Sequence, residues 1–210
     1  MQTIQLTLGG YETNCYLVSG APGRCVVIDP ADEGARLLRE LDAHGLTPEA
    51  VLLTHGHYDH ILAVPDLQER WPSLLVYYHP ADCPEALTEY DMGQVFPTVS
   101  AFSNLRPLGE GQVLTLAGLS IAVLETPGHT PGSVTFRVED GLFTGDTLFY
   151  VDIGRTDFEG GSYPQIMRSL RRLTRLEGDF NVLPGHGPAS TLGYERRFNP
   201  YLKGGAAPEW

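Results

Sequence analysis

Short apolar runs bounded by glycine, proline or aspartate dominate the first third of the chain, and this pattern predicts strands. The predicted strands, of which the first two form a hairpin, cover residues 2–8, 13–19, 25–28, 50–53 and 74–78. Between the third and fourth strands, leucines recur at helical spacing. Asp32 is placed to cap the start of this helix, and His44-Gly45 to end it. A second helix is expected after His79-Pro80.

The second half of the chain returns to strands, with one long helix among them. The predicted strands there cover residues 113–116, 120–125, 133–138, 142–144 and 181–183. A helix is expected from about Tyr163 to Glu177, where apolar residues line one face. Strands and helices in two successive halves predict two sheets packed together with helices outside. We find no linker in the sequence and interpret residues 1–210 as a single domain.

Composition and charge narrow the class of protein. No stretch approaches the roughly 20 apolar residues needed to span a bilayer. The N-terminal residues lack the features of a signal peptide, and three scattered cysteines make no disulfide framework, so we expect a cytoplasmic protein. The net charge of −12 argues against a nucleic acid or an anionic membrane as partner, because phosphate contacts require clustered cations.

A dense group of metal-binding residue types follows the predicted strand at residues 50–53. The segment His55-Gly56-His57-Tyr58-Asp59-His60 holds three imidazoles and a carboxylate, which are the ligands preferred by zinc and by divalent iron or manganese. In an extended segment His55 and His57 point to the same side, whereas Asp59 and His60 would start a helix and face elsewhere. The spacing therefore favours one metal on the histidine pair and a second on the Asp–His pair.

Four donors cannot complete two coordination spheres, so others must come from elsewhere in the chain. Three candidates share one context, a strand end followed by a glycine-rich turn; they are His129 after Gly128, Asp146 after Gly145 and His186 after Gly185. Glycine beside each candidate leaves room for a metal or a substrate close to the backbone. Each turn is a weak signal alone, but three of them behind the histidine segment are a strong one.

The order of these motifs resembles that of the metallo-β-lactamase superfamily over essentially the whole chain. The resemblance implies an α/β fold, the αββα sandwich of two mixed β-sheets with helices on the outer faces. It also implies two divalent metal ions, zinc first, with iron or manganese as alternatives. The implied ligands are His55, His57 and His129 for the first ion, Asp59, His60 and His186 for the second, and Asp146 bridging both.

Three further segments resemble a narrower branch, the small glyoxalase II-like hydrolases. They are residues 145–149, 154–157 and 195–200. For this branch the implied substrate is a glutathione ester or another small thiol ester, cleaved to a hydroxy acid and a thiol. Two ions would hold a bridging hydroxide for attack on the acyl carbonyl, since metal binding lowers the pKa of water toward roughly 7. Asp59 is placed to accept or deliver a proton and is the candidate catalytic residue.

Contacts to the substrate are less specified by the sequence. Arg155 follows the bridging Asp146 and could bind a substrate carboxylate or serve as a structural ion-pair partner. Tyr11 and Tyr58 flank the predicted site loops and are candidates for its rim. Only a short tail follows His186, whereas full-length glyoxalase II enzymes carry a helical region that contacts glutathione. The expected partner is therefore a small-molecule thioester or ester, and the sequence does not specify the thiol part.

Other activities of the same fold compete with the hydrolase. The main alternative is a persulfide dioxygenase, for which the resemblance implies a single iron on His57 or His55, His129 and Asp146. A lactonase or esterase and a non-catalytic metal-binding protein are less favoured. A β-lactamase is disfavoured because the best-known class has a cysteine where this chain has Asp146.

Overall fold

Two six-stranded sheets form the centre of the computed structural model, which describes residues 1–83, 88–90 and 94–203. The strand order of the first sheet is β1 (Gln2–Leu8), β2 (Thr13–Ala21), β3 (Arg24–Ile28), β4 (Thr47–Leu52), β5 (Leu75–Tyr78) and β8 (Leu105–Pro107). The order of the second is β16 (Ser190–Thr191), β15 (Asn181–Pro184), β12 (Gly141–Gly145), β11 (Val134–Val138), β10 (Leu119–Glu125) and β9 (Val113–Leu116). Both sheets mix parallel and antiparallel pairs.

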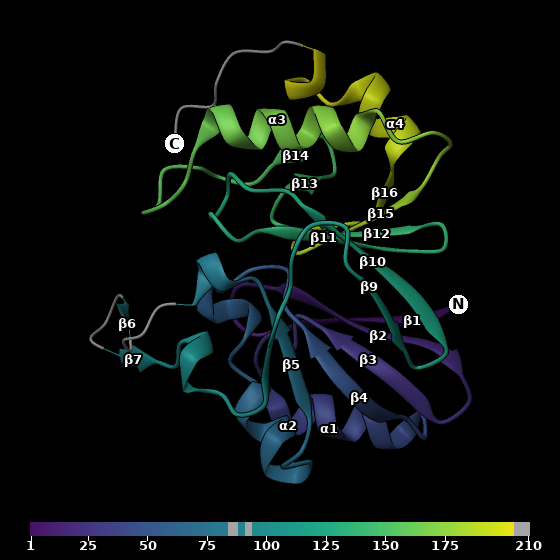
Figure 1. The fold of residues 1–210 in the computed structure, drawn as a ribbon, viewed down its shortest axis with the longest axis vertical. Helices are drawn as coiled ribbons and strands as arrows, with labels where there is room; N and C mark the ends of the chain where they lie inside the picture. The colour runs from purple at the N-terminus through teal and green to yellow at the C-terminus, as the bar shows by residue number, and fades with distance from the viewer. Residues whose placement is uncertain (84–87, 91–93, 204–210) are drawn as a thin grey trace.

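Helices cover the outer face of each sheet, so the molecule has four layers (Figure 1). Helices α1 (Gly34–Ala43) and α2 (Val64–Arg70) pack on the first sheet, whereas α3 (Tyr163–Thr174) and α4 (Leu192–Phe198) pack on the second. This arrangement confirms the predicted αββα sandwich. Among the described residues, no helix is both long and apolar enough to cross a membrane.

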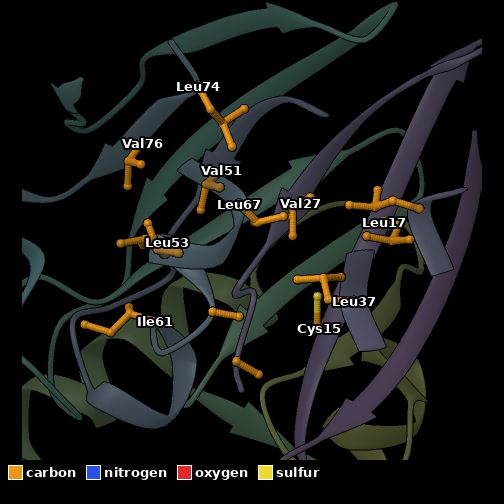
Figure 2. Close-up of a cluster of buried hydrophobic side chains, with 14 of the residues drawn as sticks. Cys15, Leu17, Val27, Leu37, Val51, Leu53, Ile61, Leu67, Leu74 and Val76 are labelled. Atoms are coloured by element: carbon orange, nitrogen blue, oxygen red, sulfur yellow. The ribbon is translucent and has the colours of Figure 1, made fainter. Parts of the chain in front are cut away.

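The alternation of side chains along the strands explains the layers. On β3, Val27 faces α1 and α2, whereas its neighbours Val26 and Ile28 face the second sheet. Figure 2 shows the outer of these two cores, where Val27 and Val51 from adjacent strands meet the helical leucines. Every strand of this kind is buried on both faces, which is why the sequence shows short apolar runs rather than clean alternation.

Two local predictions for the first half are wrong. Asp32 does not cap α1, because Glu33 adopts a left-handed conformation (φ 54°) and the helix begins only at Gly34. The Oδ1 atom of Asp32 accepts a hydrogen bond from the Glu33 amide instead. After His79 the described chain forms a 3₁₀ turn at Pro80–Asp82 and then the hairpin of β6 (Thr88–Tyr90) and β7 (Gln94–Phe96), not a helix. The part of that prediction at residues 84–87 lies outside the described residues.

Candidate metal centre

All seven predicted donors lie together at one edge of the sandwich, where strands of both sheets end. His55, His57, Asp59 and His60 follow β4 of the first sheet, and the other three follow strands of the second. Strand β2 ties the sheets together here, because the Asn14 amide donates to the carbonyl of Gly185 at 2.7 Å and the Tyr16 hydroxyl to that of Pro184. The donors therefore converge from two halves of the chain.

The first group of donors consists of His55, His57 and His129. Their ligand atoms lie within 4.8 Å of one another, and His57 Nδ1 is 2.9 Å from His129 Nε2. The Nε2 atom of His55 is buried without a hydrogen-bond partner. An unpaired polar atom in this position is costly unless something else satisfies it, and a metal ion would do so.

The second group consists of Asp59, His60 and His186, which meet the same distance limit. His186 Nε2 lies 3.3 Å from both Asp59 Oδ2 and His60 Nε2. Asp146 stands between the two groups: its Oδ2 is 3.4 Å from His129 Nε2 and 3.5 Å from His186 Nε2. Its Oδ1 is buried without a hydrogen-bond partner, like the imidazole nitrogen of His55. The geometry matches two adjacent sites that share one carboxylate.

Hydrogen bonds outside the cluster orient three of the imidazoles. His129 Nδ1 lies 2.8 Å from the Arg155 carbonyl, and His186 Nδ1 lies 3.0 Å from that of Tyr11. His60 Nδ1 lies 2.9 Å from Asp29 Oδ2. Because a carbonyl or carboxylate accepts only from a protonated nitrogen, the neutral form of each of these imidazoles carries its lone pair on Nε2, which faces the cluster.

The electrostatics of the cluster also suit a cation. Burial, together with the nearby His129, lowers the pKa of His57 to about 4, so this imidazole is neutral at pH 7. Burial opposes protonation of His60, but the surrounding carboxylates of Asp59, Asp146 and Asp29 outweigh it and raise its pKa to about 10. The carboxylates thus stabilise positive charge at the centre, and a bound divalent ion would provide that charge. The donor set of imidazoles and carboxylates fits zinc, iron or manganese.

A family comparison agrees with this geometry: the model of the metallo-β-lactamase superfamily matches residues 8–186. The chain belongs to the metallo-β-lactamase superfamily. It is 42% identical to an uncharacterised protein of Mycobacterium tuberculosis, over 91% of this chain and 93% of that protein. It is 35% identical to the hydroxyacylglutathione hydrolase GloC of Haemophilus influenzae, again over 91% and 93% of the two chains.

Solved structures of the superfamily have the same fold. The B3 metallo-β-lactamase BLEG-1 superposes with a TM-score of 0.87 at 35% identity, covering 96% of this chain and 99% of that one. The protein TTHA1623 in a di-iron-bound form gives 0.85 at 40% identity, covering 95% and 100%. ETHE1 from Myxococcus xanthus gives 0.79 at 31% identity, covering 97% and 85%.

Two buried carboxylates that support the superfamily's donor loops were not predicted from the sequence. Asp29, at the end of β3, accepts hydrogen bonds from the amide and hydroxyl of Thr54 at 2.8 and 2.6 Å, besides holding His60. Asp82 accepts from the amides of Gly56 and Gly132 at 3.1 and 2.6 Å. Asp82 thereby joins the loop of His55 and His57 to the loop of His129. The only sequence signal concerned Asp29, which directly follows an apolar strand, and an aspartate in that position usually indicates a helix or turn cap.

Asp29→Asn should weaken metal binding without unfolding the protein. An amide at position 29 offers at most one of its two atoms as an acceptor, so His60 and Thr54 lose a shared anchor. Outer-shell partners of this kind change metal affinity by about 10–100-fold, and we expect a loss in that range. Competition against a chromophoric chelator measures it, and Asp42→Asn, an exposed aspartate on α1, is the matched control. An unchanged affinity would show that Asp29 does not orient His60.

Close backbone packing positions Arg155, the candidate substrate contact. A Cβ atom on Gly154 would lie 1.7 Å from the Asp146 carbonyl oxygen, so only glycine fits there. Because the backbone at Gly154 passes so close to Asp146, the Arg155 carbonyl reaches His129 Nδ1. The Arg155 side chain forms a bidentate ion pair with Asp157 at 2.7 and 2.6 Å. The guanidinium also lies 4.0 Å from the ring centre of Phe158. The ion pair, one of the two roles considered for Arg155, is therefore present in the structure.

The two predicted rim residues, Tyr11 and Tyr58, line a cleft of about 330 Å³ beside Asp59. Tyr11 and Tyr58 meet edge to face, with ring centres 5.5 Å apart. The ring of Tyr58 also stacks on Phe96 at 4.5 Å. The candidate metal centre thus has an aromatic cleft beside Asp59 and an arginine near His57.

Proposed function

We propose that the protein is a binuclear metal-dependent hydrolase of small thioesters. One observation carries the proposal: two three-donor groups lie side by side, and between them stands the carboxylate of Asp146, whose buried Oδ1 has no hydrogen-bond partner. His55, His57 and His129 would hold one ion, Asp59, His60 and His186 the other, and Asp146 both. Two divalent ions held in this way supply a nucleophile from water at neutral pH and polarise a carbonyl oxygen.

The likeness to the hydroxyacylglutathione hydrolase GloC supports a thioester as substrate. Hydrolysis breaks the carbonyl C–S bond, forms a C–O bond to the oxygen of water, and transfers a proton from that water to the departing sulfur. The chain must therefore orient the acyl group and provide a group that can take up a proton and release it. Arg155 and Phe158, near His57, and Tyr11 and Tyr58, beside Asp59, are the candidates for contact with the substrate.

Asp59 is the residue of this chain best placed to move the proton. Its Oδ2 accepts from the Thr13 hydroxyl at 3.1 Å and lies 3.3 Å from His186 Nε2. Burial opposes its ionisation, but the imidazoles of His60 and His186 outweigh burial and lower the pKa of the carboxyl. Asp59 is therefore ionised at neutral pH. The lowered pKa makes it a weak base, so its proposed role rests on the position of Oδ2, from which a proton taken up passes on to the departing sulfur.

Thioester turnover by the metal-loaded protein tests this function. We expect cleavage of hydroxyacyl thioesters and a loss of about a hundredfold in kcat for Asp59→Asn, since a positioned base is worth about 10²–10⁴-fold. The released thiol is followed with a disulfide dye, and Asp66→Asn, a surface aspartate in the first turn of α2, is the control. Failure to cleave any thioester, ester or lactone from a broad panel would refute the hydrolase. β-Lactams belong in the panel because of the likeness to BLEG-1.

A persulfide dioxygenase with one iron is the second candidate, and the likeness to ETHE1 supports testing it. Elemental analysis of protein expressed with both zinc and iron available separates the two candidates. About two ions per chain favour the hydrolase, whereas one iron without zinc, together with oxygen consumption on a persulfide, favours the dioxygenase. The count is repeated after metal addition because an expression host can misload such a site.

A further inference from the structure

A strained turn joins the two short strands that follow Asp146. Strands β13 (Leu148–Phe149) and β14 (Asp152–Ile153) pair antiparallel, and Tyr150 and Val151 form the turn between them. Val151 has a φ of 57° and is the one β-branched residue among the described non-glycine residues with positive φ. Glycine or asparagine usually occupies such a turn position, and a β-branched residue there is a rare outlier. The surrounding structure must therefore hold Val151 in this conformation.

The side chain that holds the turn is the carboxylate of Glu195 on α4. Its Oε2 accepts a hydrogen bond from the Val151 amide at 2.9 Å, and its Oε1 accepts one from the Ser190 hydroxyl. Asn199, directly after α4, donates from Nδ2 to Glu195 Oε2 at 2.9 Å and to the Asp152 carbonyl at 3.1 Å. Glu195 and Asn199 are fully buried, so water does not compete for these hydrogen bonds.

Glu195 has no oppositely charged partner in the described part of the chain. Its three hydrogen-bond donors are a backbone amide, a hydroxyl and a side-chain amide, all of them neutral. Burying a charge in this way is costly even when it is fully hydrogen-bonded. The segment 195–200 resembles the glyoxalase II-like branch, yet it contains none of the seven metal donors. A buried charge kept at such a cost indicates a task, and the turn is what it holds.

The hairpin of β13 and β14 connects two parts of the metal centre. Strand β13 begins two residues after Asp146. Strand β14 is followed by Gly154, where an added Cβ atom would lie 1.7 Å from the Asp146 carbonyl oxygen. The next residue is Arg155, whose carbonyl oxygen lies 2.8 Å from His129 Nδ1. Because each strand has only two residues, a change in the turn is carried to both ends of the hairpin.

We propose that Glu195, through the turn at Val151, is a positioning residue for the metal donors at the two ends of the hairpin. These donors are Asp146, which would hold both ions, and His129, which the Arg155 carbonyl orients. A displaced hairpin therefore weakens metal binding at the shared carboxylate and at the three-histidine group. The proposal rests on the metal centre of the proposed function, but it does not depend on which substrate is cleaved.

The zinc affinity of the metal-free protein, measured by competition with a chromophoric chelator, tests this role without any substrate. Glu195→Ala should lower the affinity about tenfold, the lower end of the range for outer-shell partners, because the Val151 amide loses its acceptor. Glu195→Gln should keep an affinity close to that of the wild type. Its carbonyl oxygen can still accept from Val151 and Asn199, while its NH₂ group donates to the Ser190 hydroxyl. Glu177→Ala, at an exposed glutamate after α3, is the control and should leave the affinity unchanged.

A second substitution, in the turn itself, separates positioning from a general loss of stability. Glycine adopts positive φ without strain, so Val151→Gly should restore most of the zinc affinity of Glu195→Ala. Val151→Ala shortens the same side chain but keeps the penalty for positive φ, so it should restore none. If Glu195→Ala does not fold, Asn199→Ala takes its place. That variant frees the Asp152 carbonyl and leaves the carboxylate on Val151, and the affinity should again fall.

Several results would overturn the proposal. An unchanged zinc affinity in folded Glu195→Ala, or in Asn199→Ala if only that variant folds, would show that the turn does not act on the donors. Equal losses in Glu195→Ala and Glu195→Gln would trace the effect to charge. Rescue that is absent with Val151→Gly, or equal with Val151→Ala, would exclude the strained turn as its route.

The same measurements distinguish this proposal from the proposed function. A wild-type protein that binds zinc but cleaves no thioester, ester or lactone would overturn the hydrolase and leave the role of Glu195 standing. A wild-type protein that binds no zinc, iron or manganese would overturn both.

Discussion

Replacing Asp146 with alanine should lower the metal content from about two ions per chain to one or fewer and reduce thioester turnover at least about a thousandfold. Asp146 lies within 3.5 Å of donor atoms from both groups, and its Oδ1 is buried without a hydrogen-bond partner in the protein. Losing it removes a ligand from both proposed sites at once. A metal supplies several kcal/mol of transition-state stabilisation, and each 1.36 kcal/mol is worth about tenfold in rate.

Elemental analysis and steady-state kinetics on the same preparations measure this effect. Asp140→Ala is a suitable control, because Asp140 precedes the opposite end of β12 and its exposed carboxylate accepts a hydrogen bond from the Asn181 side chain. Circular dichroism should show the same secondary structure in both variants. A variant that keeps two ions and more than a tenth of the turnover would mean that Asp146 does not bridge the two groups.

Phe143→Ala should lower the free energy of unfolding by about 3–5 kcal/mol, the usual cost of a large aromatic removed from a well-packed core. Phe143 is 1% exposed on β12 and lies between the sheets, with its ring centre 5.2 Å from that of Tyr16. Neither sheet can move independently to fill the cavity, because β2 and the loop after β15 are hydrogen-bonded beside the metal centre. The cavity therefore stays open.

Urea unfolding of chelator-treated protein measures this loss without a contribution from bound metal. Phe198→Ala deletes the same ring from a position that is 45% exposed, and it should cost about 1 kcal/mol or less. Phe143→Leu keeps most of the apolar volume and should restore much of the stability. Equal losses for Phe143→Ala and Phe198→Ala would show that the inter-sheet core is not what holds the two halves together.

Local patterns in the sequence were enough to predict the sandwich and the neighbourhood of the seven donors. Strands such as β3 and β4 are buried on both faces, so their apolar runs stand out in the sequence. The donors follow strand ends with glycine beside them, a signal that is visible without any tertiary information. The strand pattern predicted two packed sheets with helices outside, and the superfamily was indicated by the resemblance in the order of the donor motifs.

The sequence could not predict contacts that depend on distant residues. Asp29 accepts hydrogen bonds from Thr54 and His60, which lie 25 and 31 residues further along the chain. The residues next to Asp29 in the sequence give no indication of those partners. Asp82 binds Gly132, 50 residues away, for the same reason. The error at Asp32 has a different origin: the left-handed backbone of Glu33 delays the helix start, and no propensity favours that conformation for glutamate.

The division of the donors between the two sheets has a consequence for biosynthesis. The ribosome adds His55, His57, Asp59 and His60 first, and His186 follows His60 by 126 residues. A growing polypeptide therefore offers an incomplete set of ligands for most of its synthesis, and an ion caught early can still exchange. Selection of the resident metal is consequently left to the finished protein and the ion pool around it.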